Sequence, residues 1–239
     1  MKPVLSARNI SKSFRQADGS FFKVIEDVGL DLYSQEIVCL LGPSGSGKSS
    51  LLQILAGLHP LDTGSINAEI QCPGSQLGYM TQTDRLLPWR NLQDNVGLGL
   101  ELLGSSKAKA RAIACSYLKK VGLETFLTSY PHQISGGMYQ RVLLSRTLAT
   151  NPKIIFLDEP MSNLDVLARR QMASMVRDYV KTNNASALVV THSVEEACFL
   201  ADRILLITRS PAVVHKEITP PLQLDVVMAT LLETLEAAA

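Results

Sequence analysis

The chain has 239 residues, a size that suits one large domain or a core with a subdomain. Hydrophobic residues make up 46% and charged residues 19% of the sequence, a globular balance that excludes an intrinsically disordered chain. The formal net charge of +1 gives no electrostatic argument for binding nucleic acid.

The first part of the chain predicts short strands around one glycine-rich loop. Apolar alternation and short apolar runs predict strands at residues 4–10, 22–32, 36–41, 65–70 and 76–81. Residues 15–20 form a turn-rich connection between the first two strands. The loop follows the third strand, and a helix is predicted after it, at residues 48–58.

The loop matches the phosphate-binding pattern G-x-x-x-x-G-K-[ST] in the strand–loop–helix context that this motif requires. Its glycines let backbone N–H groups face phosphates, and the helix N-terminus adds partial positive charge. Lys48 is expected to reach the β- and γ-phosphates and Ser49 to ligate magnesium. The motif therefore predicts a nucleoside triphosphate site with contacts from Gly42, Pro43, Ser44, Gly45, Ser46, Gly47, Lys48, Ser49 and Ser50.

The remaining chain predicts a helical stretch and then alternating strands and helices. Helical periodicity dominates residues 84–150. Beyond it, strands are predicted at 153–157, 186–190 and 203–207, and helices at 168–180, after Ser193 and at 222–236. The stretch from Lys48 to Asp158 far exceeds the ~30 residues of one strand–helix–strand crossover. We therefore expect an α/β core (residues 1–83 and 151–239) with a helical subdomain inserted at about 84–150.

Two further short runs could bind ligands. One places two carboxylates at the end of a predicted strand, and the other places glycines with accessible N–H groups before a predicted helix. Asp158 and Glu159 end an apolar strand, where one carboxylate can hold magnesium and the other can orient or deprotonate water. The alternative is a strand-end pair that caps the next helix. Ser135-Gly136-Gly137 precedes a helix predicted at 138–149 and offers a second anion site, or else a plain loop-to-helix junction.

Residues 134–141, Ile-Ser-Gly-Gly-Met-Tyr-Gln-Arg, resemble the signature motif of ATP-binding cassette (ABC) transporter ATPases. The resemblance extends from Phe14 to about Pro211. Other stretches resemble the family's remaining motifs, and they follow in the family's order. Residues 42–49 resemble the Walker A loop, Gln82 the Q-loop glutamine, residues 158–159 the end of Walker B, residues 162–165 the D-loop and His192 the switch histidine.

The resemblance implies a P-loop NTPase core with a mixed sheet, an antiparallel β subdomain and an inserted helical signature subdomain. It also implies an ATPase that uses ATP and Mg²⁺. Glu159 would be the catalytic base, His192 would contact the γ-phosphate, and Gln82 would sense magnesium and the attacking water. The further nucleotide contacts would be Ser135, Gly136, Gly137 and Asp165, and the magnesium ligands Ser49, Gln82 and Asp158.

Some positions leave alternatives or depart from the family's pattern. Phe14 resembles the aromatic residue that stacks on adenine, although Phe21 and Phe22 are nearby rivals and Phe14 could instead serve the core. Met138 replaces the signature's common glutamine, and Asn163 replaces the usual D-loop alanine. Because the phosphate contacts use the backbone, we expect activity to survive both changes.

Residues 86–90 and 130–133, with Met138, resemble the nitrate/sulfonate/taurine importer branch. The resemblance implies a head-to-tail pair with an identical or closely related chain, transmembrane permease subunits and, indirectly, a solute-binding protein. It places the chain on the cytoplasmic face of the membrane. Trp89 would contact the permease or lie in the core. The alternatives are a soluble ABC ATPase without a transport role and a P-loop phosphotransferase.

The compartment is predicted from the cysteines and the N-terminus. Four cysteines show no metal or redox spacing, and Cys39 and Cys198 fall in apolar stretches, which favours buried free thiols in a reducing cytosol. The N-terminus lacks the apolar core of a signal peptide, and no stretch approaches about 18 uninterrupted apolar residues. Any membrane role is therefore expected to depend on a partner.

Overall fold

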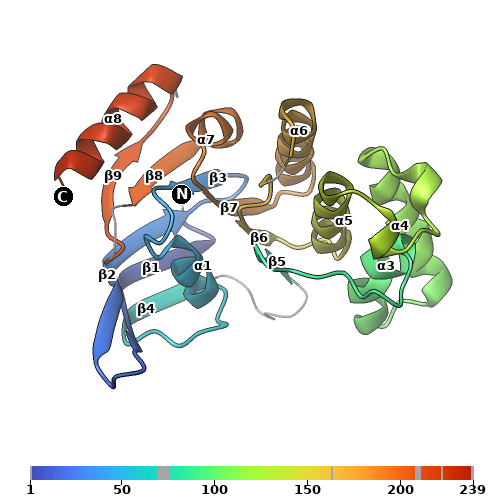
Figure 1. The fold of residues 1–239 in the computed structure, drawn as a ribbon, viewed down its shortest axis with the longest axis horizontal. Helices are drawn as coiled ribbons and strands as arrows, with labels where there is room; N and C mark the ends of the chain where they lie inside the picture. Colours follow the sequence, from blue (N-terminus) through green and yellow to red (C-terminus); the bar gives the residue numbers. More distant parts are fainter. Residues whose placement is uncertain (1, 69–75, 163, 208–210, 222, 238–239) are drawn as a thin grey trace. The chain divides into compact units, whose positions relative to one another are not determined.

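The computed structural model describes residues 2–68, 76–162, 164–207, 211–221 and 223–237. The chain forms two compact units, one of residues 1–71 with 186–239 and one of residues 72–185. The blue and red ends of the chain in Figure 1 both belong to the first unit. The predicted helical subdomain, residues 84–150, falls inside the second unit.

The first unit contains an antiparallel sheet, as predicted. Its strands are β1 (Leu5–Arg15), β2 (Phe21–Leu32) and β4 (Thr63–Ala68), in the order β2-β1-β4. Apolar side chains on β1 and β2 that alternate along the strands are buried, including Leu5, Ala7, Val28 and Leu30. The alternation of buried and exposed positions is the pattern of a sheet with one face covered.

The first unit also contains a mixed sheet. Strand β3 (Ile37–Leu41) pairs in parallel with β7 (Ser186–Thr191) and β8 (Arg203–Ile207), and β9 (Val214–Ile218) pairs antiparallel with β8. Every residue of β3 and β7 is buried, which explains their uninterrupted apolar runs. The described residues of this unit also form helices α1 (Lys48–Leu55), α7 (Val194–Leu200) and α8 (Leu224–Ala237), with α7 contacting α8.

The second unit is mainly helical. It contains a parallel pair of strands, β5 (Leu77–Met80) and β6 (Ile154–Asp158), connected through helices α3 (Leu92–Leu102), α4 (Lys107–Lys120) and α5 (Gly136–Ala149). Helix α6 (Val166–Thr182) follows β6. Short 3₁₀ helices occupy Glu124–Phe126 and Pro131–Gln133. Helices α3, α4 and α5 contact one another and form the cluster drawn in green and olive in Figure 1.

Each of these helices begins at a polar side chain that accepts a hydrogen bond from the first turn. The capping residues are Asn91, Ser106, Ser135 and Asp165. Such caps satisfy N–H groups that a helix leaves without an internal partner. Helix α5 starts two residues earlier than predicted, because Ser135 is its cap and both following glycines are helical.

The burial of the cysteines and the length of the helices can be compared with the predicted buried thiols and the predicted lack of a membrane-spanning segment. Cys39 is buried as predicted, and burial raises the pKa of its thiol well above the usual range. Cys198 is only half-buried, so the expectation of a buried thiol was wrong there, and Cys72 lies outside the described residues. Within the described part of the chain, the helices are all too short or too polar to cross a membrane.

Candidate nucleotide-binding site

The phosphate-binding loop joins β3 to α1 in the first unit and encloses the ammonium group of Lys48. The Nζ atom of Lys48 donates to the carbonyl oxygens of Gly42 at 2.9 Å and Pro43 at 2.7 Å, and to Oγ of Ser46 at 3.2 Å. Lys48 is only 4% exposed. The loop therefore concentrates positive charge at the start of α1, the end of a helix that favours anions.

Gly47 places this loop against strand β2. Its φ of 90° is in the left-handed region, and it precedes α1 as a cap without a side chain. A Cβ added there would lie 2.8 Å from the carbonyl oxygen of Val24 and 3.1 Å from the Cβ of Ala212. Gly45 also has a positive φ, 76°, but a Cβ there would meet nothing within 4 Å. Gly47 thus packs the loop directly against Val24 and Ala212.

In the second unit, the structure brings Gln82 and Glu159 together. Nε2 of Gln82 donates to Oε2 of Glu159 at 3.0 Å. Glu159 has a φ of 49°, a left-handed conformation that is uncommon for a residue other than glycine. Asp158, the last residue of β6, is 3% exposed. Asp165 caps the helix that follows, so the alternative that the two carboxylates cap it is wrong.

The signature run lies at the first turn of α5. The hydroxyl of Ser135 accepts a hydrogen bond from the N–H of Met138 at 3.3 Å. A Cβ added to Gly136 would meet nothing within 4 Å, so the chain is open on that side. This geometry fits an anion site and equally fits a plain loop-to-helix junction.

Helix α5 also binds the segment that follows Gln82. The hydroxyl of Tyr139 accepts a hydrogen bond from the N–H of Leu86 at 2.6 Å. Arg146 forms an ion pair with Asp84 at 2.8 Å and donates to the carbonyl oxygen of Arg85 at 2.8 Å. These contacts join residues about 60 positions apart, and no short sequence pattern could have indicated them.

Trp89 lies in the same segment and is 72% exposed. The alternative that it is a core residue is therefore wrong. Its contact with a permease stays a prediction.

The aromatic residues of the first two strands divide between the two faces of the sheet. Phe14 on β1 pairs with Phe22 on β2, and the neighbouring Phe21 is 74% exposed. Phe14 is half-buried rather than part of the core. Its ring lies perpendicular to that of His59 at 6.2 Å, and the ammonium of Lys12 is 5.6 Å from its centroid. Sequence reasoning missed Lys12, although its place two residues before Phe14 puts both on one strand face.

His192 follows β7 in the first unit and is exposed. The turn that carries it is fixed by its neighbours, because the hydroxyl of Thr191 donates to Glu196 at 2.8 Å and accepts from the N–H of Ser193 at 3.0 Å. The predicted magnesium ligands are divided: Ser49 lies in the first unit, whereas Gln82 and Asp158 lie in the second. The full magnesium set stays a prediction, and Asn163 lies outside the described residues.

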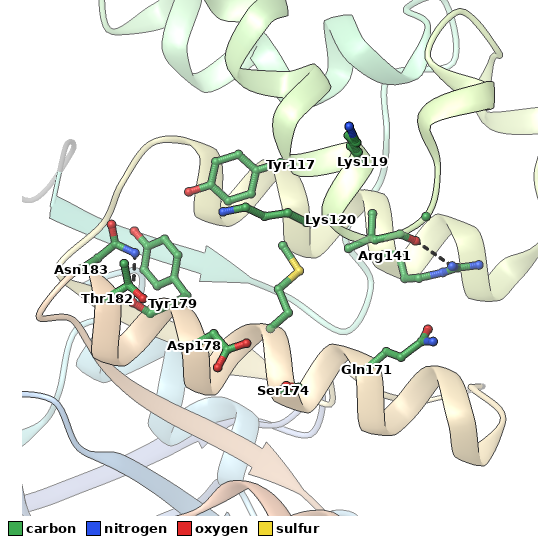
Figure 2. Close-up of a pocket in the computed structure, with 13 residues that line it drawn as sticks. Tyr117, Lys119, Lys120, Arg141, Gln171, Ser174, Asp178, Tyr179, Thr182 and Asn183 are labelled. Atoms are coloured by element: carbon green, nitrogen blue, oxygen red, sulfur yellow. Dashed lines mark hydrogen bonds between the residues drawn. The ribbon is translucent and has the colours of Figure 1, made fainter.

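A separate pocket of about 790 Å³ lies within the second unit, among α4, α5 and α6 (Figure 2). Tyr117 and Lys120 line it from α4, Arg141 from α5 and Tyr179 from α6. None of the predicted site residues lines it. The pocket is therefore distinct from the nucleotide contacts predicted in this unit.

Comparisons with known proteins agree with the motifs. The family model described as ABC transporter matches residues 25–162. A taurine import ATP-binding protein of Escherichia coli O157:H7 is 44% identical over 191 residues, which are 79% of this chain and 75% of that protein. An ABC transporter ATP-binding protein of Methanocaldococcus jannaschii is 39% identical over 88% of this chain and 80% of its own length.

A solved structure gives the same fold. It is a dimeric ATP-binding cassette in a post-hydrolysis state, bound to ADP and Pi, with a TM-score of 0.81 and 27% identity. The match covers 90% of this chain and 98% of that one.

Proposed function

The chain belongs to the ABC transporter family, and from this premise we propose that it is the ATP-hydrolysing subunit of an importer for a small solute. The hydrogen bond from Gln82 to Glu159 carries the proposal, because it joins the predicted catalytic base to the segment expected to meet the permease. The taurine import relatives favour a taurine-like sulfonate or a similar small anion as the solute. Family membership argues against the phosphotransferase alternative.

In the proposed reaction, Lys48 binds the β- and γ-phosphates and Glu159 takes a proton from the attacking water. Glu159 has a left-handed backbone conformation, and its side chain accepts the hydrogen bond from Gln82. Ser49, Gln82 and Asp158 offer hydroxyl, amide and carboxylate oxygens, which are the hard ligands that Mg²⁺ takes. Bound magnesium would neutralise charge on the phosphate oxygens. We assign the γ-phosphate contact to His192.

The proposed working form is a head-to-tail pair of this chain with itself or with a close paralogue. Ser135 and Gly137 of one subunit would complete the site that holds Lys48 of the other, with Asp165 also at that interface. The open side of Gly136 supports this arrangement, because a second subunit can approach the start of α5 there. ATP binding then favours the closed pair, and hydrolysis lets it open.

Coupling to the membrane is assigned to residues 82–90, which we call the coupling segment. Trp89 offers an exposed apolar surface to a permease subunit on the cytoplasmic face of the membrane. A displacement of this segment would be transmitted to Glu159 through Gln82, and to the signature run through Tyr139 of α5. The chain would be peripheral, attached to the membrane through the permease.

The catalytic assignment is tested with Glu159→Gln. The variant is expected to bind ATP, to lose steady-state hydrolysis and to run as an ATP-dependent dimer in size-exclusion chromatography. Glu195→Gln is the control, because Glu195 is an exposed carboxylate on α7 and should leave hydrolysis unchanged. Hydrolysis by Glu159→Gln at the parent rate would remove Glu159 from the mechanism.

The transport role is tested by co-purification. The tagged chain is expected to retain an integral membrane protein that lacks its own ATPase domain. Recovery of a soluble complex only, with ATPase activity intact, would favour the non-transport ATPase instead.

A further inference from the structure

We propose that Lys12 is a positioning residue for the nucleotide base: its ammonium, anchored by Asp62, lies over the ring of Phe14 and strengthens stacking of adenine on that ring. The inference rests on the proposed function, since it takes Phe14 as the adenine contact. The ammonium nitrogen is 5.6 Å from the ring centroid, within the range of a cation–π contact.

Asp62 fixes the position of the Lys12 side chain. The Nζ atom of Lys12 is 2.7 Å from Oδ1 of Asp62, and Oδ2 of Asp62 accepts from the N–H of Ser13 at 2.7 Å. The N–H of Asp62 in turn donates to the carbonyl oxygen of Ser11 at 3.0 Å. The hydrogen bond from Lys12 holds the pKa of Asp62 below its usual value, so the carboxylate is ionised at neutral pH. The Lys12 side chain is only 12% exposed.

The place of Phe14 in the fold connects this cluster to the phosphate-binding loop. Phe14 pairs across the sheet with Phe22, which lies two residues before Val24. Val24 is the residue against which Gly47 of the loop is packed. The β1–β2 pairing shifts register at Val24, so at about 3.3 Å per residue Phe22 and its partner lie no more than roughly 7 Å along the strand from Val24. A nucleotide with its phosphates in the loop can therefore extend its base to Phe14, and all of these residues belong to the first unit.

The charge of Lys12 changes what the ring offers to a base. A cation near an aromatic ring draws π-electron density toward itself, which leaves the ring less negative elsewhere. Adenine carries π density of its own, so repulsion between the stacked rings falls. Contact with the His59 ring also limits how Phe14 can turn. Both effects act on the base and neither acts on the phosphates.

The experiment compares two ligands and five variants of the full chain, one of them a double variant, by isothermal titration calorimetry. The ligands are ATP and inorganic tripolyphosphate, which keeps the phosphates and lacks the base. Lys12→Met is expected to weaken ATP binding about fivefold and to leave tripolyphosphate binding unchanged. Phe14→Ala is expected to weaken ATP binding at least tenfold. Once Phe14 is alanine, Lys12→Met should have no further effect.

Two matched variants serve as controls. Lys12→Arg keeps the cation and should keep ATP affinity within twofold. Arg8→Met removes a different ion pair on the same strand, with Asp31 at 2.8 Å, and should leave ATP affinity unchanged.

Several results would overturn the proposal. These are an equal loss for tripolyphosphate, a loss in Lys12→Arg as large as in Lys12→Met, or a Lys12→Met effect that persists without Phe14. If the parent chain binds tripolyphosphate but gains nothing from the base, the role of Phe14 and Lys12 fails while the phosphate-binding loop stands. If it binds neither ligand, the proposed function itself fails.

Discussion

Replacing Gly47 by alanine tests how the phosphate-binding loop is seated. The substitution adds a Cβ at a position with a φ of 90°, which alanine disfavours. The same Cβ would lie 2.8 Å from the carbonyl oxygen of Val24 and 3.0 Å from its Cγ1 atom. The Val24 carbonyl accepts a hydrogen bond from the N–H of Ala212 at 2.7 Å, so it cannot turn aside as a long side chain can, and either the loop or β2 must shift.

The expected cost has two parts. The left-handed conformation costs alanine about 1–2 kcal/mol, and an added group in a packed site costs about 1–3 kcal/mol. Together they lower the free energy of unfolding by about 2–5 kcal/mol. For a chain of this size, each kcal/mol shifts the melting temperature by about 2–4 °C. We therefore expect Gly47→Ala to melt roughly 4–20 °C below the parent.

Variants at two other glycines distinguish the conformational cost from the cost of the close contact. Gly45→Ala and Gly57→Ala also place alanine at positive φ, 76° and 73°, but their Cβ atoms would meet nothing within 4 Å. Each should pay the conformational cost alone, about 1–2 kcal/mol. Thermal unfolding followed by circular dichroism, without nucleotide, measures all three. If Gly47→Ala melts at the same temperature as Gly45→Ala, the contact with Val24 does not constrain the loop and the reasoning is refuted.

Three further predictions concern the second subunit, the metal and pH. Ser135→Arg should abolish hydrolysis while ATP still binds the monomer, measured by calorimetry and phosphate release; unchanged hydrolysis would contradict the shared site. Removal of Mg²⁺ with EDTA should stop hydrolysis without changing the far-ultraviolet circular dichroism spectrum, and hydrolysis that continues would exclude the metal. Arg111 donates to Asp94 at 2.6 Å and holds the pKa of that carboxyl below its usual 3.8. Arg111→Met should therefore lower the free energy of unfolding at pH 7, and the difference should shrink as the pH falls through the lowered pKa of Asp94, because a protonated carboxyl no longer forms the ion pair. Urea titrations at pH 7 and at successively lower pH measure it, and a difference that stays constant as the pH falls would contradict the ion-pair explanation.

Much of the fold follows from local patterns. The segments that form β3 and β7 carry runs of four or more apolar residues, and burial on both faces of the sheet explains such runs. The loop at Lys48 combines glycines, a lysine and a helix start within a few residues, so a short motif describes it fully. Strand β9 was missed, because three of its five residues are exposed and its sequence shows no clear alternation.

The parts of the candidate site that escaped prediction depend on contacts between distant residues. The left-handed backbone of Glu159 has no signal in a glutamate, a residue that seldom adopts it. The bond from the Leu86 N–H to the Tyr139 hydroxyl and the Asp84–Arg146 pair exist only once α5 lies beside the coupling segment. Sequence patterns report local geometry, whereas these contacts are decided by packing.

The coupling segment is held by polar contacts and by the side chain of Leu86, which is 3% exposed. Gln82 bonds to Glu159, Asp84 pairs with Arg146, and the N–H of Leu86 bonds to Tyr139. Each such contact contributes about 1 kcal/mol net, because water offers replacement partners when it breaks. Exposing the buried side chain of Leu86 would cost more, about 1.5–3 kcal/mol. The contacts of Gln82 and Asp84 can therefore change partners at small cost, whereas the segment is held more firmly at Leu86.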